Sequence, residues 1–203
     1  MKIQSKFREH FRDNRIQYII VVTLFVLGLI MGNFKVGGLD GAVRERLLQM
    51  LDAYFGGQQA AATGPGIFIS ACLNQGRFML AVWALGLTVI GIPLIMAVVF
   101  MRGFSLGFTV GFLLQEKAGA GVMLSLISLL PQNLIYIPLL LVAAVLAVNF
   151  SLYILRGRSY GKASLGVSLL GYSALMGLLM LVFMTGAFVE AYLVPWLLHI
   201  FIK

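Results

Sequence analysis

The sequence is poor in charge and in the side chains that build common catalytic and metal sites. Only 11% of its 203 residues are charged and 61% are hydrophobic, whereas soluble domains are about 25% charged and about 45–50% apolar. A soluble globular domain, a disordered chain and a coiled coil are therefore excluded. The one cysteine, Cys72, has no partner for an internal disulfide, and the two histidines, His10 and His199, lie near opposite ends.

No set of residues typical of an enzyme stands out. The sequence has no GxxxxGK[ST] phosphate loop, and no nucleophile, carboxylate pair or cluster of metal ligands lies at a recognisable spacing. We therefore expect no enzyme activity, no catalytic residue, no metal site and no cofactor.

Basic residues exceed acidic ones by 15 to 7, and they are unevenly placed. Residues 1–15 and 156–164 together hold eight of the basic residues, whereas 33–77 holds four and balances three of them with acids. The positive-inside rule puts the first two segments in the cytoplasm and 33–77 outside. In so apolar a chain the excess indicates anchoring at a membrane surface and no nucleic-acid binding.

The apolar runs predict an all-α integral membrane protein in one domain, with about five crossings. The predicted spans are 16–32, 78–101, a short one within 103–133, 134–155 and 165–189, followed by an outer tail, 190–203. Arg102 is expected to end the second span on the cytoplasmic side. Residues 16–32 could also be the apolar part of a signal peptide, but the run is long and no Ala-x-Ala site follows it.

Residues 103–133 are the least regular part of the sequence. Residues 103–114 would make a helix of only about 18 Å, whereas the hydrocarbon core is about 30 Å thick. A polar patch at 115–117 separates this piece from a second apolar piece, 120–130. We expect a short third span followed by a half-helix that re-enters from outside; one long broken helix is the alternative.

The predicted outer loop contains an amphipathic pattern over 39–55. Leu39, Leu47 and Tyr54 fall on one face of a helix. This helix could pack on its own bundle, lie on the outer leaflet or bind a partner.

Two further features concern the spans. Gly103, Gly107 and Gly111 recur every four residues, a spacing that lets two helix backbones approach closely. It serves packing within the bundle or self-association, so a homodimer stays open. Glu190 ends the last apolar run; we expect it at the outer interface, bonded to Tyr192 or to a nearby helix end.

Several short motifs occur in a characteristic order: Asn74, Arg102-Gly103 with Gly107, Leu130-Pro131, and Glu190-Ala191-Tyr192 with Pro195. In this order, and over nearly the whole chain, the sequence resembles the stage II sporulation protein M family of bacterial membrane proteins. The wider family often shows Pro-His-Gly with a Glu shortly after it. Here Gln132 and Asn133 follow Pro131, and Tyr136 stands near the place of the acid.

The resemblance implies a non-catalytic membrane scaffold in endospore formation, located in the sporulation septum and the engulfing membrane. It would anchor and localise a peptidoglycan-degrading complex of stage II sporulation proteins P and D during engulfment of the forespore. We expect partner contacts in the outer loop, outer turn and tail, at Leu39, Leu47, Tyr54, Pro131, Gln132, Asn133, Glu190 and Tyr192.

The alternative function is a permease-like subunit that works with a separate ATPase. It would need polar side chains of the spans to converge on one pathway. The candidates are Ser125, Ser128, Gln132, Asn133, Asn149, Ser168, Tyr172, Ser173 and Thr185.

Overall fold

The computed structural model describes residues 12–55, 64–156 and 165–196, and at 51–55, 117–128 and 130 it describes the backbone alone. Within these ranges the chain is helical almost throughout and forms no strand. Five segments are long and apolar enough to cross a membrane. The prediction of an all-α membrane protein with about five spans is therefore confirmed.

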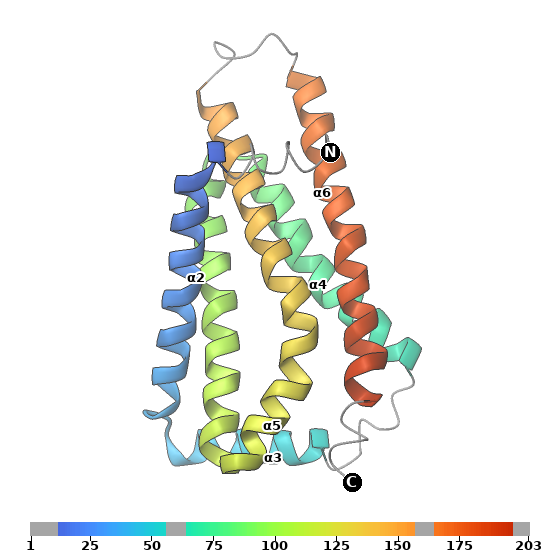
Figure 1. Cartoon of the computed structure of the whole chain (residues 1–203). Helices are drawn as coiled ribbons and strands as arrows, with labels where there is room; N and C mark the ends of the chain where they lie inside the picture. The colour runs from blue at the N-terminus through green and yellow to red at the C-terminus, as the bar shows by residue number, and fades with distance from the viewer. Residues whose placement is uncertain (1–11, 56–63, 157–164, 197–203) are drawn as a thin grey trace.

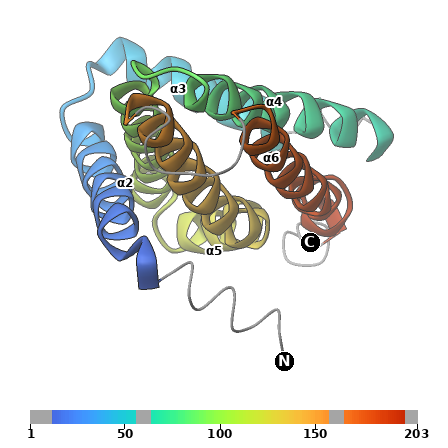
Figure 2. The same cartoon turned by 90° about the horizontal axis from the view of Figure 1, so that it is seen from above.

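The helices form one bundle (Figure 1). Their bounds are α2 Arg15–Val36, α3 Gly41–Phe55, α4 Gly64–Gly86, α5 Gly91–Leu155 and α6 Leu165–Phe188, and the π-helix η2, Val189–Leu193, continues α6. Seen from above, α5 lies between α2 on one side and α4 and α6 on the other (Figure 2). Helix α3 lies across one end of the bundle, and α2 begins at the opposite end (Figure 1).

Helix α5 crosses the bundle twice. Its 65 residues would extend about 98 Å in a straight line, about three times the thickness of a bilayer core. Instead it contains two spans, Gly91–Glu116 and Pro131–Leu155, and the chain turns back between them (Figure 1). These are called the first and second legs of α5.

The prediction of one helix over 78–101 was wrong, because the chain turns sharply inside that range. The N–H of Thr88 bonds to the carbonyl of Leu85 at 3.0 Å, and its hydroxyl bonds to the same oxygen at 2.9 Å. Gly91 then begins α5, and a methyl group there would collide with the Leu85 carbonyl. Pro93 lies in the first turn of the new helix, where its missing N–H costs nothing.

The remaining boundaries shift accordingly. The second span is α4, much of which was predicted to belong to the outer loop 33–77. The third span has 26 residues and is not short, so the expectation for 103–114 was also wrong. The half-helix predicted at 120–130 falls largely on residues whose side chains lie outside the described part. These errors have one cause: Arg77 and Arg102 were taken as span ends, and both lie inside helices.

Helices α2 and α5 touch backbone to backbone along a line of glycines. A Cβ atom at Gly28 would collide with the carbonyl of Phe100, and one at Gly107 with the carbonyl of Leu29. Gly32 and Gly103 likewise face backbone carbonyls, and Gly111 faces the side chain of Asn33. This contact is here called the glycine seam; it consists of Gly28, Gly32, Gly103, Gly107 and Gly111. The glycine face of α5 is therefore covered by α2 of the same chain.

The second leg of α5 is the centre of the bundle. Ala143, Ala144, Val145 and Ala147 are completely buried, and these small side chains allow neighbouring helices to come close. The outward faces of α2 and α6 are apolar instead, as lipid contact requires. Examples are Ile19, Val22, Val26 and Ile30 on α2 and Leu170, Leu178 and Leu181 on α6.

We predict that Gly107→Ala destabilises the protein because its methyl group has no space in the glycine seam. Overpacking of this kind costs about 1–3 kcal/mol, and each kcal/mol lowers Tm by about 2–4 °C in a chain of this size. Thermal unfolding of the purified protein in detergent measures the effect.

The matched control is Gly177→Ala on α6, where an added Cβ meets no atom within 4 Å. Alanine favours a helix over glycine by about 1 kcal/mol, so Tm should stay constant or rise. Equal losses in both variants would contradict the importance of the seam.

Candidate functional site: a polar pocket inside the bundle

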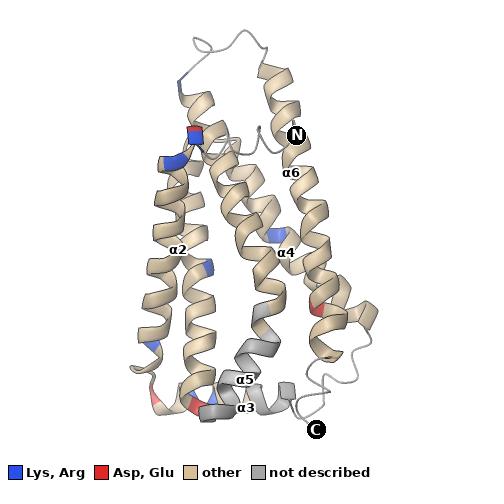
Figure 3. Cartoon of the chain, viewed as in Figure 1, with Lys and Arg blue, Asp and Glu red and all other residues tan. Residues whose placement is uncertain are grey.

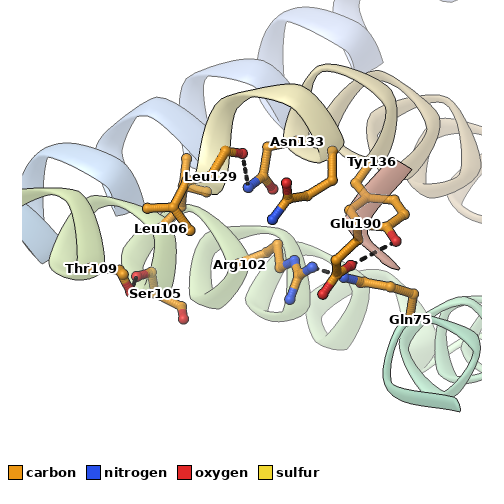
Figure 4. A pocket seen from close by; sticks show the side chains of 10 residues that line it. Gln75, Arg102, Ser105, Leu106, Thr109, Leu129, Asn133, Tyr136 and Glu190 are labelled. Carbon is orange, nitrogen blue, oxygen red and sulfur yellow. Dashed lines mark hydrogen bonds between the residues drawn. The ribbon is translucent and has the colours of Figure 1, made fainter. Parts of the chain in front are cut away.

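A pocket of about 190 Å³ lies among α4, both legs of α5 and η2 (Figure 4). Its lining consists of Gln75, Arg102, Ser105, Leu106, Thr109, Leu129, Gln132, Asn133, Tyr136 and Glu190. Eight of these ten residues have polar side chains. Such a concentration is unusual for the interior of so apolar a bundle, since polar groups in a membrane are costly.

Arg102 supplies the positive charge of the pocket from the first leg of α5. It lies 11 residues after Gly91, so about 17 Å along the helix, close to the middle of the span. Its guanidinium donates a hydrogen bond of 2.6 Å to Oε1 of Gln75 and lies 4.9 Å from the ring centre of Phe78. The expectation that Arg102 ends a span at the cytoplasmic surface was wrong, because the span begins at Gly91.

Glu190 supplies the negative charge from the π-helix that continues α6. The hydroxyl of Tyr136 donates a hydrogen bond of 2.9 Å to its Oε2 atom, and Tyr136 itself is buried. The apolar helical span continues beyond Glu190 to Trp196, so the carboxylate lies within the span. Glu190 was predicted to bond Tyr192 or a helix end at the outer interface; its bonding partner is Tyr136. Short π-helical segments occur frequently at functional sites.

The two charges attract each other across the pocket. Figure 4 shows Arg102, Gln75, Tyr136 and Glu190 pointing towards one another. The attraction and the two hydrogen bonds offset the cost of taking both charges out of water. The arrangement therefore links α4, both legs of α5 and η2, and presents a cation, an anion and amide groups to the space of the pocket.

Pro131, Gln132 and Asn133 were predicted to form an outer turn that contacts partners. The structure instead has all three in α5, at the start of its second leg. Gln132 is buried, and the amide of Asn133 donates to the carbonyl of Leu129 at 2.7 Å. The prediction failed because Pro131 was interpreted as the end of the preceding apolar piece, whereas α5 continues through it.

The predicted outer helix forms over Gly41–Phe55, close to the expected 39–55. Leu39 and Leu47 are half-buried, and the side chain of Tyr54 lies outside the described residues. An ion pair holds this helix to the bundle: Nε of Arg44 lies 2.6 Å from Oε1 of Glu116. The Glu116 side chain is only 9% exposed and that of Arg44 is 51% exposed, so Arg44 lies on the solvent side of the ion pair and Glu116 on the buried side.

Tyr192 lies apart from the pocket residues on the surface of η2. Its side chain is 42% exposed, and its ring packs against Gly64, where an added Cβ would come within 2.7 Å of it. Of the predicted contact residues, the structure thus gathers Gln132, Asn133 and Glu190 in one pocket.

Reasoning from the sequence missed Gln75, Arg102 and Tyr136 as members of this site. Tyr136 was noticed only as a departure from a family motif, and Arg102 only as a supposed boundary and as part of the Arg102-Gly103 motif. The signal that could have found Arg102 is Gly91-Ile92-Pro93, which begins a helix here. A helix starting there places Arg102 near the middle of a span.

We predict that the charges of the pocket are energetically coupled. Removing one charge leaves the other without the attraction across the pocket. Because Arg102 and Glu190 are both half-buried, the cost should stay below the roughly 3–5 kcal/mol of a fully buried ion pair. Arg102→Met and Glu190→Leu should each lower Tm, and the double variant should lose less than the sum of the two. A double-mutant cycle by thermal unfolding measures the coupling, and strict additivity would contradict it.

The comparisons with known proteins agree with the resemblance noted in the sequence. The family model of Stage II sporulation protein M matches residues 21–195, a range that includes every pocket residue and both sides of the glycine seam. No curated protein and no solved structure matches the chain. The chain therefore belongs to the stage II sporulation protein M family and is a sporulation-related membrane protein.

Proposed function

We propose that the protein is a non-catalytic membrane scaffold for engulfment. It anchors and localises a peptidoglycan-degrading complex, which includes stage II sporulation proteins P and D, in the sporulation septum and the engulfing membrane. Family membership supports the link to sporulation. The scaffold role is inferred from how the polar groups and the outer helix are arranged.

The observation that carries the proposal is the dispersal of polar side chains among separate, internally bonded sites. Asn149 bonds to Asn14 at 2.6 Å and to Gln17 at 3.3 Å. Trp83 donates to the hydroxyl of Ser173 at 3.2 Å. Further sites are Ser168 with Tyr153, Tyr172 with the Trp83 carbonyl, and Thr185 with the Val182 carbonyl.

A permease needs polar groups that line one continuous pathway. Of the described candidates, only Gln132 and Asn133 line the polar pocket, whose two charges are compensated by each other. Ser125 and Ser128 lie among the residues whose side chains are not described. The arrangement therefore favours a rigid bundle that holds other proteins over the alternative of a permease-like subunit.

Helix α3 offers such partners a firm surface outside the membrane. It lies at the end of the bundle opposite the start of α2 (Figure 1), and the positive-inside rule assigns the basic N-terminal end to the cytoplasm. Arg46, Val43 and Met50 are exposed on it, while the Arg44–Glu116 ion pair holds it to α5. We propose this face as the contact for wall-degrading partners.

We predict that Glu116→Arg releases α3 from the bundle, because it places two positive charges together. Overall Tm should change little, since half-exposed pairs contribute about 1 kcal/mol or less. In a Cys72→Ser background, a cysteine at half-buried Leu48 should react faster with a membrane-impermeant maleimide. The exchanged pair Arg44→Glu with Glu116→Arg should restore slow labelling; persistent fast labelling would contradict the ion-pair anchor.

We predict that deletion of the gene in its endospore-forming host blocks engulfment. The septum should form, but membrane dye should show no migration of the mother-cell membrane around the forespore. Wild-type protein should restore migration and co-purify with stage II sporulation proteins P and D; Glu116→Arg should restore it poorly. Normal engulfment in the deletion strain would overturn the scaffold proposal.

A further inference from the structure

Helix α4 is the span whose outward face fits lipid least well. It has the lowest mean hydropathy of the five spans, and with α6 it has the smallest buried share. Its exposed side carries Gly66, Ser70, Asn74, Arg77, Ala81 and Ala84, here called the α4 face. Their spacings of 4, 4, 3, 4 and 3 residues place them on one side of a helix.

The α4 face combines an arginine, an asparagine and a serine with small residues, whereas many of the exposed residues of α2 and α6 are large and apolar. Serine and asparagine in membrane spans form hydrogen bonds to neighbouring helices, and glycine and alanine let a neighbouring backbone approach. Leu73 and Leu80 lie beside them and are also exposed. The composition is that of a contact between helices, on a side where the described part of the chain places no further helix.

Arg77 is the most costly residue on the α4 face. It lies 13 residues from Gly64 and 9 from Gly86, so about 20 Å and about 14 Å from the two ends of the helix. It points away from the buried side of α4, which carries Met79 and Val82. Within the ranges that the structure describes, its guanidinium forms no ion pair or hydrogen bond. A cation facing hydrocarbon at this depth is costly, and a compensating acidic group lowers that cost.

A second copy of the chain does not supply that group. A two-fold contact through α4 would bring the two Arg77 side chains together, and like charges repel. The span acids among the described residues are already engaged, since Glu116 binds Arg44 and Glu190 accepts from Tyr136. Charges in the bundle otherwise lie mainly towards its ends (Figure 3).

We propose that the α4 face binds a transmembrane helix of another protein that carries an aspartate or glutamate at mid-membrane depth. The acid pairs with Arg77, Ser70 and Asn74 bond polar groups of the same helix, and Ala81 and Ala84 lie against its backbone. The inference rests on the scaffold proposal for the biological role of the partner. The surface and the charge of the partner helix are argued from α4 alone.

Crosslinking in sporulating cells tests the proposal with the full chain. A photoreactive amino acid is placed at Ala81 or Ala84, and at Gly171 or Gly177 of α6 as controls that face open space. We expect the α4 positions to capture one protein with a membrane-spanning acid. Arg77→Leu should reduce this capture at least tenfold, and Arg77→Lys should retain it.

The charge pair is then tested from both sides. Replacing the acid of the captured helix by its amide should cause the same loss, and exchanging the two charges should restore capture. Thermal unfolding of Arg77→Leu separates binding from folding, because leucine suits lipid and Tm should not fall. Ser70→Leu serves as a second variant that keeps the charge and fills the contact.

Capture of lipid only, capture of a second copy only, or capture unaffected by Arg77→Leu would each overturn the proposal. A captured acidic helix from a protein other than stage II sporulation proteins P and D would support this inference while contradicting their assignment as the partners. The deletion strain tests the scaffold role, and the crosslinking tests the α4 face. A failure of either proposal can therefore be told apart from a failure of the other.

Discussion

The glycine seam between α2 and α5 is the contact on which the other features depend. In lipid, apolar side chains gain little by leaving one apolar surface for another, so close backbone contact must hold helices together. Gly103 and Gly107 fix the first leg of α5 against Leu29 of α2. Because successive residues are about 100° apart around a helix, holding Gly103 on α2 turns Arg102 towards α4, where it meets Gln75.

The glycine seam joins α5 to α2, and the polar pocket joins α5 to α4 and η2 on its other side. Arg102 and Glu190 come from spans far apart in the sequence, and each is bonded to a third element, by Gln75 and Tyr136 respectively. Charges that would be costly alone become a specific connection when they face each other. Gln132 and Tyr136, which stand where the family resemblance implies a histidine and an acid, both line this pocket.

Two surfaces of the bundle are the proposed contacts for partners. One is the exposed side of α3, which the Arg44–Glu116 ion pair holds to α5; the other is the α4 face with Arg77 at its centre. In the proposed orientation α3 lies on the wall side and the α4 face contacts lipid, an arrangement that suits partners with both a membrane anchor and a domain on the wall side.

The sequence by itself determined the all-α membrane fold, the number of spans, the amphipathic helix α3 and the family, because these depend on apolar content, periodicity and local motifs. It also identified the glycines of α5, since a four-residue repeat defines a helix face. Which partner covers that face, and which charges lie inside a span, were decided only by the tertiary structure. In the sequence alone, Arg77 and Arg102 resemble residues at the ends of spans. In the structure, the turn before Gly91 places Arg102 inside a span, where Gln75 and Glu190 face it. Arg77 faces outwards from α4. The energy of a charge in a membrane depends on its neighbours in space, which hydropathy along the chain does not contain.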